Sequence, residues 1–460
     1  MKILLVVYDN DSYISEFPIG LAYIASILLR EGYEVDVFNQ DIHHYPDEEL
    51  TRRLDAEKYD VVGISVIAGY YQYRKLLKLS EAVNRSKNRP VYIIGGHGPS
   101  PEPEYFLKKT QADIAVIGEG EETVVELFQA LAQKRGLAGI LGIAYREGDT
   151  VTVNQRRPLI VDIDTIPLPA YHKFPMECYR LARYPHSSRS DFGISMLSGR
   201  GCTFLCNFCY RMDKGFRPRK VEPLIEEIKM LKKDFGITYI AFYDELLMSS
   251  VERTEELSEA FLKANLNIKW NCNGRLNYAE PELLKLMKKS GCVFINYGIE
   301  AMDDETLKVM KKGLTTKQII KGIEATLAAG ISPGFNIIFG NINEDRETLR
   351  KGVEFLLKYD DGAQLRTIRP VTPYPGSPLY YHAIKEGFMK NCEDFYENKH
   401  INSDLLAINF TKLSDDDFHM ALMEANSTLV KNYYEKMTIN ILEQTKNLYV
   451  KKDATFRGFR

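Results

Sequence analysis

The 460-residue sequence lacks the features that mark membrane, nucleic-acid-binding and disulfide-stabilised proteins. No apolar run approaches the ~20 residues that a helix needs to cross a membrane, so we expect no membrane span. The net charge is only −3, which argues against nucleic-acid binding by bulk electrostatics. The seven cysteines are an odd number, and three of them are clustered. This pattern argues against a disulfide framework and predicts a reducing, cytoplasmic environment.

The three clustered cysteines, Cys202, Cys206 and Cys209, have a CxxxCxxC spacing that predicts a [4Fe-4S] cluster. A cubane cluster usually has four thiolate ligands, so three leave one iron open to bind and reduce a substrate. Structural zinc is one alternative, but it needs a fourth ligand, and the next cysteines, Cys272 and Cys292, are far along the chain. The other alternative is three unrelated core thiols, because free cysteine is often buried.

Residues 1–138 alternate strand-like and helix-like stretches, beginning with the apolar run Lys2–Tyr8, which is predicted as a strand rather than a signal peptide. The alternation predicts a parallel sheet, whose ligands bind at the carboxyl ends of the strands. Glycines there allow close approach of a ligand, although ordinary turns also favour glycine. The candidate binding residues at these ends are Ser65, Val66, Tyr70, Gly95, Gly96, His97, Gly118, Glu119, Gly120 and Glu121.

Three further regions follow. Residues 139–188 are predicted as a connector with a small hairpin and a proline-rich linker. Residues 189–380 contain six strand–helix units, fewer than the eight of a full barrel. Residues 381–460 show mainly helical periodicity. The expected strands of the third region are Ile194–Ser198, Tyr239–Asp244, Ile268–Asn273, Val293–Ile299, Gly334–Phe339 and Leu365–Val371.

The cysteine spacing, the preceding Gly199–Cys202 and the aromatic Phe208 before the third cysteine resemble the radical S-adenosylmethionine (SAM) superfamily. The segments around Pro18–Ala25 and Ile117–Thr123 look like the cobalamin-binding domain that precedes many radical SAM domains. The resemblance implies an α/β fold: a Rossmann-like cobalamin-binding domain, a partial (β/α)6 barrel with the cluster loop after its first strand, and a mostly helical C-terminal region. It implies three cofactors: a [4Fe-4S] cluster, SAM and cobalamin.

The resemblance also assigns SAM contacts at the strand ends of the partial barrel. Acidic groups suit the ammonium and hydroxyls of SAM, although Asp244 and Glu245 are alternatively a helix cap and first-turn charge. Arg275 is expected to pair with the SAM carboxylate or with Glu300. Cys272 and Cys292 are expected to be core thiols. The remaining assignments are Glu300 to the ribose, and Phe208 and Asn336 to the adenine.

Asp41 and His43 form part of the Asp-x-His-x-x-Gly motif that supplies the cobalt-ligating imidazole in cobalamin mutases. Here the motif follows the second strand, and Pro46 stands where the glycine would be. We therefore predict that His43 and His44 are solvated loop residues. No histidine stands in the loop after the first strand, so the lower cobalt face is expected to be water-bound, empty, or shielded by the Val66–Tyr71 loop.

The resemblance implies an anaerobic enzyme that cleaves SAM reductively to a 5′-deoxyadenosyl radical and methylates an unactivated carbon through methylcobalamin. The sequence also resembles anaerobic Mg-protoporphyrin monomethyl ester cyclases, so oxidative cyclisation or ring rearrangement without methyl transfer is an alternative. A non-catalytic corrinoid or iron–sulfur carrier is another. The expected partners are a small-molecule or peptide substrate and an electron donor such as flavodoxin or ferredoxin, with no nucleic acid.

Overall fold

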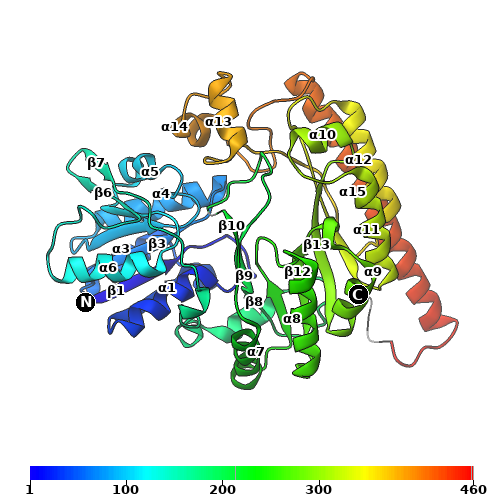
Figure 1. The fold of residues 1–460 in the computed structure, drawn as a ribbon, viewed down its shortest axis with the longest axis horizontal. Helices are drawn as coiled ribbons and strands as arrows, with labels where there is room; N and C mark the ends of the chain where they lie inside the picture. The colour runs from blue at the N-terminus through cyan, green and yellow to red at the C-terminus, as the bar shows by residue number, and fades with distance from the viewer. Residues whose placement is uncertain (213, 457, 459–460) are drawn as a thin grey trace.

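The computed structural model describes residues 1–212, 214–456 and 458. Two α/β lobes lie side by side, and a helical C-terminal region crosses from one to the other (Figure 1). Within the described ranges, no helix is both long enough and apolar enough to cross a membrane.

The first lobe is built on a seven-stranded sheet in the order β2-β1-β3-β4-β5-β6-β7. The first five strands of this order are parallel, and β6 and β7 are antiparallel additions at the β5 edge. The hairpin that we expected in the connector therefore extends the first sheet. The strands are β1 (Lys2–Val7), β2 (Glu34–Asn39), β3 (Val61–Ser65), β4 (Val91–Gly95), β5 (Ile114–Val116), β6 (Ile143–Glu147) and β7 (Thr150–Val153).

Helices cover both faces of this sheet, which explains why the central strands are almost continuously apolar. In β1, Ile3 and Val6 are fully buried although they point to opposite faces. On α4, Tyr73, Leu76 and Val83 are buried at helical spacing. The helices are α1 (Ile19–Arg30), α2 (Gln40–His43), α3 (Asp47–Ala56), α4 (Tyr70–Arg85), α5 (Pro103–Thr110) and α6 (Glu121–Ala132).

The second lobe is an open half-barrel of six parallel strands in the order β15-β14-β13-β12-β11-β8, as the six strand–helix units predict. A two-stranded ribbon, β9 (Gly199–Cys202) with β10 (Gly215–Pro218), follows its first strand. The sheet strands are β8 (Gly193–Met196), β11 (Tyr239–Phe242), β12 (Lys269–Gly274), β13 (Cys292–Glu300), β14 (Ser332–Phe339) and β15 (Arg369–Pro370). The helices are α7 (Val221–Phe235), α8 (Val251–Lys263), α9 (Pro281–Lys289), α10 (Asp304–Val309), α11 (Thr316–Ala328) and α12 (Arg346–Tyr359).

The last strand is shorter than the sequence suggests. We expected Leu365–Val371, but only Arg369 and Pro370 pair with β14. Just before these residues, the backbone N–H and oxygen of Ile368 bond to the Asn426 side chain of α15 and not to a strand. Proline has no backbone N–H to donate, and Pro370 is tolerated here because β15 is the edge of the sheet. Cys272 and Cys292, on adjacent strands of this sheet, are buried as expected.

The C-terminal region ties the two lobes together. Helix α13 (Pro378–Lys385) packs against the first lobe, where the Tyr380 hydroxyl donates to Glu102 at 3.0 Å. It is followed by α14 (Cys392–Asp394) and a π-helical turn, η5 (Phe395–Lys399). The long α15 (Asp415–Tyr449) runs along the second lobe, with Phe418 stacked on Phe339 at a centroid distance of 4.9 Å (Figure 1).

The connector also belongs to the interface between the lobes. It contains three 3-10 turns, η1 (Ile163–Thr165), η2 (Tyr171–Lys173) and η3 (Met176–Leu181). Phe17, from the loop after β1, stacks on Tyr171 with a centroid distance of 5.0 Å. The hydrophobic core thus continues from one lobe into the other.

Candidate active site between the two sheets

The three clustered cysteines lie on β9 and in the loop between β9 and β10. Cys206 is buried, and Cys202 and Cys209 are half-buried. The hydrogen bond from the Cys209 thiol lowers the pKa of Cys206, and the positive charges of Lys312 and Arg275 act in the same direction. Burial raises the pKa of Cys202. The same hydrogen bond raises the pKa of Cys209, so the pair favours the thiolate, the form that binds metal, at Cys206.

The same loop fits a cluster better than a single ion. In the part of the chain that the structure describes, no three His, Cys, Asp or Glu side chains are placed to hold one metal ion. A cubane does not need that arrangement, because each thiolate binds a different iron. Three thiols on one short loop match the donor set of such a cluster with one iron left open.

Arg275 and Glu300 do not pair with each other as we considered. The Arg275 guanidinium lies 3.4 Å from the ring centre of Phe204 in the cluster loop, and it donates to the backbone oxygen of Lys312. Glu300 instead accepts from Lys312 Nζ at 2.8 Å in a buried ion pair. Lys312 lies in the turn after α10, and nothing in its local sequence marks it as a partner of a strand-end glutamate.

Asp244 and Glu245 have different surroundings although they are neighbours. Asp244 is buried and accepts from the backbone N–H of Ser198 at 2.7 Å and of Gly199 at 2.8 Å. Burial raises the pKa of Asp244 to about 6, against the opposing effect of these hydrogen bonds. Glu245 is exposed, and its charge contributes to the raised pKa of Cys202. Asp244 thus holds the start of the cluster loop, and Glu245 is the carboxylate that faces it.

A row of asparagines crosses the half-barrel, which sequence reasoning missed apart from one member. Asn336 on β14 donates to Asn296 on β13 at 3.1 Å. Asn296 donates to Asn273 on β12 at 3.0 Å, and Asn273 donates to the backbone oxygen of Asp244 at 2.8 Å. Phe208 is packed against two hydrophobic clusters, one that runs through both lobes and one between the first lobe and the C-terminal region. The only signal for the row was an asparagine in each of three successive strands: Asn273 lies opposite Asn296, and Asn336 lies two positions beyond the partner of Asn296.

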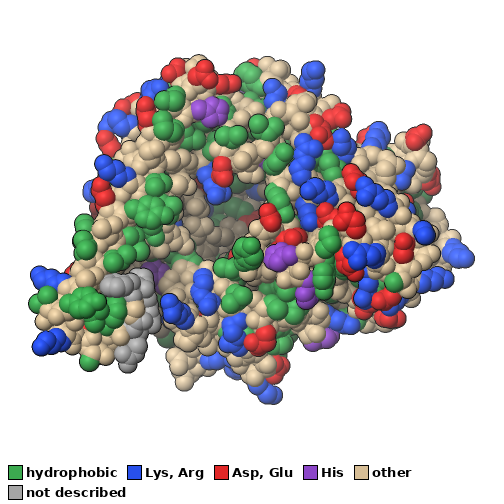
Figure 2. Space-filling model, turned by 180° about the vertical axis from the view of Figure 1, so that it is seen from behind, with side chains coloured by type: hydrophobic (Ala, Val, Ile, Leu, Met, Phe, Trp, Pro, Cys, Tyr) green, Lys and Arg blue, Asp and Glu red, His purple; other side chains and the backbone are tan. Residues whose placement is uncertain are grey.

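A cavity of about 340 Å³ separates the carboxyl edge of the first sheet from the cluster loop. Its walls are mainly apolar, and Gly20 and Gly63 line it where a side chain would reduce its volume. A Cβ atom at Gly20 would meet nothing within 4 Å. The space-filling view from behind shows that the molecule is hollowed near its middle (Figure 2). The predicted residues that line the cavity are Ser65, Gly95, Gly96, His97, Gly118, Glu119, Gly120, Glu121, Asp244 and Glu245.

The carboxylates of Glu119 and Glu121 are already paired. Arg200 of β9 donates to Glu119 at 2.9 Å and to Glu121 at 2.6 Å, and Arg217 of β10 donates to Glu119 at 2.9 Å. The hydrogen bond from Arg217 and the charge of Arg200 hold the pKa of Glu119 below its usual value, although burial opposes them. The Arg200 guanidinium also lies over the ring of Tyr23. These residues join the lobes, which the Gly199–Cys202 motif did not reveal.

The other predicted residues of the first lobe divide into two groups. His97 faces the cavity, its ring lies edge-on to Tyr210 of the cluster loop, and desolvation lowers its pKa. Val66 is buried, and Tyr70 turns toward His400, with ring centroids 6.2 Å apart. Val66 and Tyr70 do not line this cavity.

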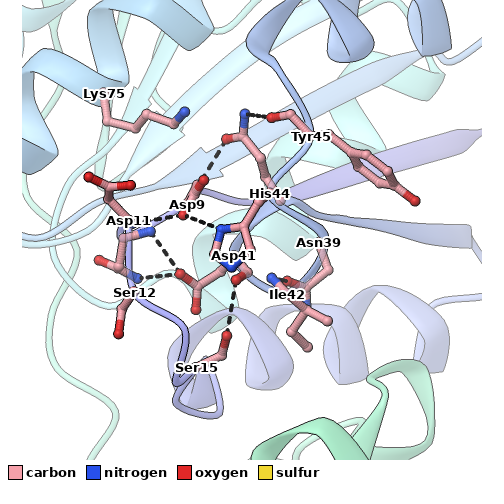
Figure 3. A network of polar contacts seen from close by, with 12 residues as sticks. Asp9, Asp11, Ser12, Ser15, Asn39, Asp41, Ile42, His44, Tyr45 and Lys75 are labelled. Carbon is pink, nitrogen blue, oxygen red and sulfur yellow. Dashed lines mark hydrogen bonds and ion pairs between the residues drawn. The ribbon is translucent and has the colours of Figure 1, made fainter.

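Asp41 belongs to a polar network between the loop after β1 and the residues that follow β2 (Figure 3), and it does not line the cavity. Asp41 accepts from the backbone N–H of Asn10 at 2.7 Å and so fixes the loop after β1. His44 Nδ1 lies 3.1 Å from the Asp9 carboxylate, and His43 stacks on Tyr45. Both histidines are exposed, as the displaced motif predicts, and neither lines the cavity.

Two family models match these two lobes. One describes a B12 binding domain and matches residues 6–128; the other describes the radical SAM superfamily and matches residues 196–356. An uncharacterized methyltransferase of Pyrococcus horikoshii is 31% identical over 100% of this chain and 96% of its own length. The chain belongs to the radical SAM superfamily.

Other radical SAM relatives differ in activity. Cytidylyl-2-hydroxyethylphosphonate methyltransferase of Streptomyces wedmorensis is 27% identical over 86% of this chain and 84% of its own. Anaerobic magnesium-protoporphyrin IX monomethyl ester cyclase of Rubrivivax gelatinosus is 27% identical over 79% of this chain and 65% of its own. The solved radical SAM methyltransferase TsrM of Kitasatospora setae, with cobalamin and a [4Fe-4S] cluster bound, has a TM-score of 0.74 at 18% identity. It covers 93% of this chain and 88% of its own, which confirms the expected fold.

The chain is therefore a cobalamin-dependent radical SAM enzyme that resembles methyltransferases. Its cofactors are a [4Fe-4S] cluster, SAM and cobalamin. The site described above suits these groups: three thiols for three irons, and a glycine-lined apolar cavity for a large planar cofactor.

Proposed function

We propose that this enzyme methylates an unactivated carbon of a small-molecule or peptide substrate. One observation carries the proposal: a single cavity has the carboxyl edge of the first sheet as one wall and the strand that leads into the cluster loop as another. A methyl donor on the first wall and a radical source on the second therefore serve one substrate position.

When bound, the reduced cluster and SAM supply a 5′-deoxyadenosyl radical for hydrogen abstraction, and methylcobalamin supplies the methyl group. The chain supplies the thiolates of Cys202, Cys206 and Cys209 and an apolar cavity that excludes water from a reactive radical. Asp244 positions the cluster loop through the backbone of Ser198. The proposed SAM contacts are Phe208, Glu245, Arg275, Glu300 and Asn336; the proposed cobalamin contacts are Ser65, Gly95, Gly96, His97, Gly118 and Gly120.

We further propose an electron donor of the flavodoxin or ferredoxin type and a cytoplasmic location, because a cluster with an open iron needs a reducing environment. Rates of SAM cleavage with reduced flavodoxin and with dithionite test the donor. Cleavage that occurs with dithionite but not with reduced flavodoxin or ferredoxin would contradict a donor of this type.

The proposed domains are the cobalamin-binding domain 1–138, the connector 139–188, the radical SAM half-barrel 189–380 and the helical C-terminal region 381–460.

Replacing Cys206 with alanine tests the radical SAM chemistry. Anaerobically reconstituted wild-type protein should hold about four iron atoms per chain and form 5′-deoxyadenosine with dithionite. Cys206→Ala should lose the iron and the product, whereas Cys178→Ala, a half-buried cysteine outside the loop, should retain both. If Cys206→Ala still forms 5′-deoxyadenosine, the assignment is wrong. A wild-type protein that holds a cluster but never cleaves SAM would be a carrier.

The fate of the SAM methyl group separates methylation from the cyclase alternative, which the relative from Rubrivivax gelatinosus supports. With SAM that carries a deuterated methyl group, methyl transfer adds three deuterium atoms to the product, and cyclisation adds none. Mass spectrometry of the product is the measurement. Absence of cobalamin absorbance bands after growth with hydroxocobalamin would contradict the cobalamin assignment.

A further inference from the structure

Asn207 stands between two of the cluster cysteines, and its amide pairs with the amide of Asn341. Asn207 Nδ2 donates to Asn341 Oδ1 at 3.1 Å, and Asn341 Nδ2 donates back to Asn207 Oδ1 at 3.0 Å. Both side chains are buried; Asn341 is 0% exposed. Two parallel hydrogen bonds fix the rotation of each amide as well as their separation.

The backbone of Asn207 is held just as firmly. Its N–H donates to the backbone oxygen of Met310, after α10, at 2.9 Å. Its own oxygen accepts from the N–H of Leu379, at the start of α13, at 2.8 Å. One residue of the cluster loop is therefore bonded to three segments at the carboxyl edge of the half-barrel.

Asn341 in turn is rigidly attached to the end of β14. It follows Gly340, whose φ of +114° is open to glycine but rarely to other residues. The N–H groups of Gly340 and Asn341 donate to the buried Glu344 carboxylate at 2.8 and 2.7 Å. The position of Asn341 therefore follows the position of β14, the strand that carries Asn336.

We propose that the Asn207–Asn341 pair sets the position of the cluster loop relative to β14, and thereby the distance between the open iron and SAM. Both are positioning residues, since neither supplies a ligand to the cluster. The proposal rests on the proposed function, because it assumes a cluster held by Cys202, Cys206 and Cys209. The hydrogen bonds of Asn207 do more than hold the loop, because two of them end on Asn341, which follows β14, the strand that carries the proposed adenine contact Asn336.

The test uses full-length, reconstituted Asn207→Ala and Asn341→Ala proteins. We expect iron content and the EPR spectrum of the reduced cluster to match wild type without SAM. The change in that spectrum on adding SAM should be diminished, and SAM cleavage should slow about tenfold, because each substitution removes both hydrogen bonds between the loop and the end of β14. The double alanine variant should be no slower than either single variant, since the two residues act as a unit.

Asn426→Ala is a matched control. Asn426 Nδ2 donates to the backbone oxygen of Ile368 at 2.9 Å, and its Oδ1 accepts from the Ile368 N–H at 2.8 Å, so this amide ties α15 to the edge strand next to β14 and not to the cluster loop. This variant should lose stability without any change in the EPR response to SAM. Asn207→Asp and Asn341→Asp keep the shape of the side chain and one bond, and their second oxygen restores the other bond only when it is protonated. If the alanine variants do not fold, these variants should give intermediate responses that approach wild type as pH falls.

Two results would overturn the proposal: a wild-type EPR response and cleavage rate in the Asn207 and Asn341 variants, or complete loss of the cluster from folded variants, which would mean that the pair retains iron. If the wild-type protein neither holds iron nor cleaves SAM, the proposed function fails and the inference fails with it. A normal wild-type protein with unaffected variants refutes the inference alone.

Discussion

The two parallel sheets face one cavity with opposite chemistry. The edge of the first sheet is built from glycines and apolar side chains, and its carboxylates, Glu119 and Glu121, are neutralised by arginines of the other lobe. The edge of the half-barrel carries thiols, the buried pair of Glu300 with Lys312, and the row of asparagines. Similar architecture thus serves two kinds of recognition: shape at the first edge, and ligation with directed hydrogen bonds at the second.

A large side chain placed in the cavity at the edge of the first sheet should have the largest effect, a loss of cobalamin binding. Gly20 lies in the first turn of α1, and a side chain added there extends into open space, so Gly20→Phe should fold normally. The ring should occupy the cavity and abolish hydroxocobalamin binding, measured as cobalamin absorbance after desalting, without loss of iron. Gly136→Phe is the control, since Gly136 also has nothing near it but does not line the cavity. Undiminished cobalamin binding by Gly20→Phe would show that the cofactor is not bound by shape at this edge.

Removing the positive charge of Arg200, which joins the two lobes, should have the next largest effect, a loss of stability. Arg200→Gln leaves Glu121 buried without its cation, and breaking a buried pair in this way costs about 3–5 kcal/mol of the free energy of unfolding. Urea unfolding measures this cost. Arg350→Gln, which removes exposed ion pairs on α12, should change stability little. A small loss for Arg200→Gln would mean that the apolar contacts alone hold the lobes together.

The pH dependence of stability should differ between the two edges, with a smaller effect than the two substitutions above. The folded protein holds the Asp244 proton up to about pH 6, above the unfolded value, so this group lowers stability as pH rises from about 4 to 6. The pKa of Glu119 is lowered, so its contribution is present above the ordinary carboxyl range and is lost as pH falls through it.

Unfolding by urea between about pH 3 and pH 8 measures both effects, because the loss for Glu119 occurs below the ordinary glutamate pKa of about 4.3. Asp244→Asn should remove the first slope, and Glu119→Gln should remove the second. If the stability of the two variants depends on pH in the same way, Asp244 and Glu119 do not act in opposite directions as we expect.

Local sequence was sufficient for most of the elements and for the proposal that Cys202, Cys206 and Cys209 bind a cluster. The apolar run of β1 and the CxxxCxxC spacing each concern neighbours within a few residues, where periodicity and ligand geometry decide the outcome. The pairing of Arg200 with Glu119 joins residues 81 positions apart, and that of Glu300 with Lys312 depends on how a turn packs. No pattern in the chain encodes such contacts.

The same limit applies to the direction of a side chain. Asp244 and Glu245 both end a strand, and sequence reasoning assigned both to SAM. The structure turns Asp244 inward to the backbone of Ser198 and leaves Glu245 facing the cavity. Similarly, the backbone of Ile368, which the sequence predicts to be part of the last strand, bonds to the side chain of Asn426, 58 positions along the chain.

The row of asparagines has a built-in polarity. The backbone oxygen of Asp244 can only accept, so Asn273 must present its NH2 group to it and its oxygen to Asn296. The same logic passes to Asn336, whose NH2 group is committed to Asn296 and whose oxygen is therefore the end turned onward. An isolated amide can turn either its NH2 group or its oxygen toward a ligand, but the hydrogen bonds of the row orient the Asn336 amide with its NH2 group on Asn296. A ligand that reaches Asn336 therefore finds the side-chain oxygen free to accept from an N–H or O–H group, whereas for donation only the second hydrogen of the NH2 group is left, because Asn296 holds the first.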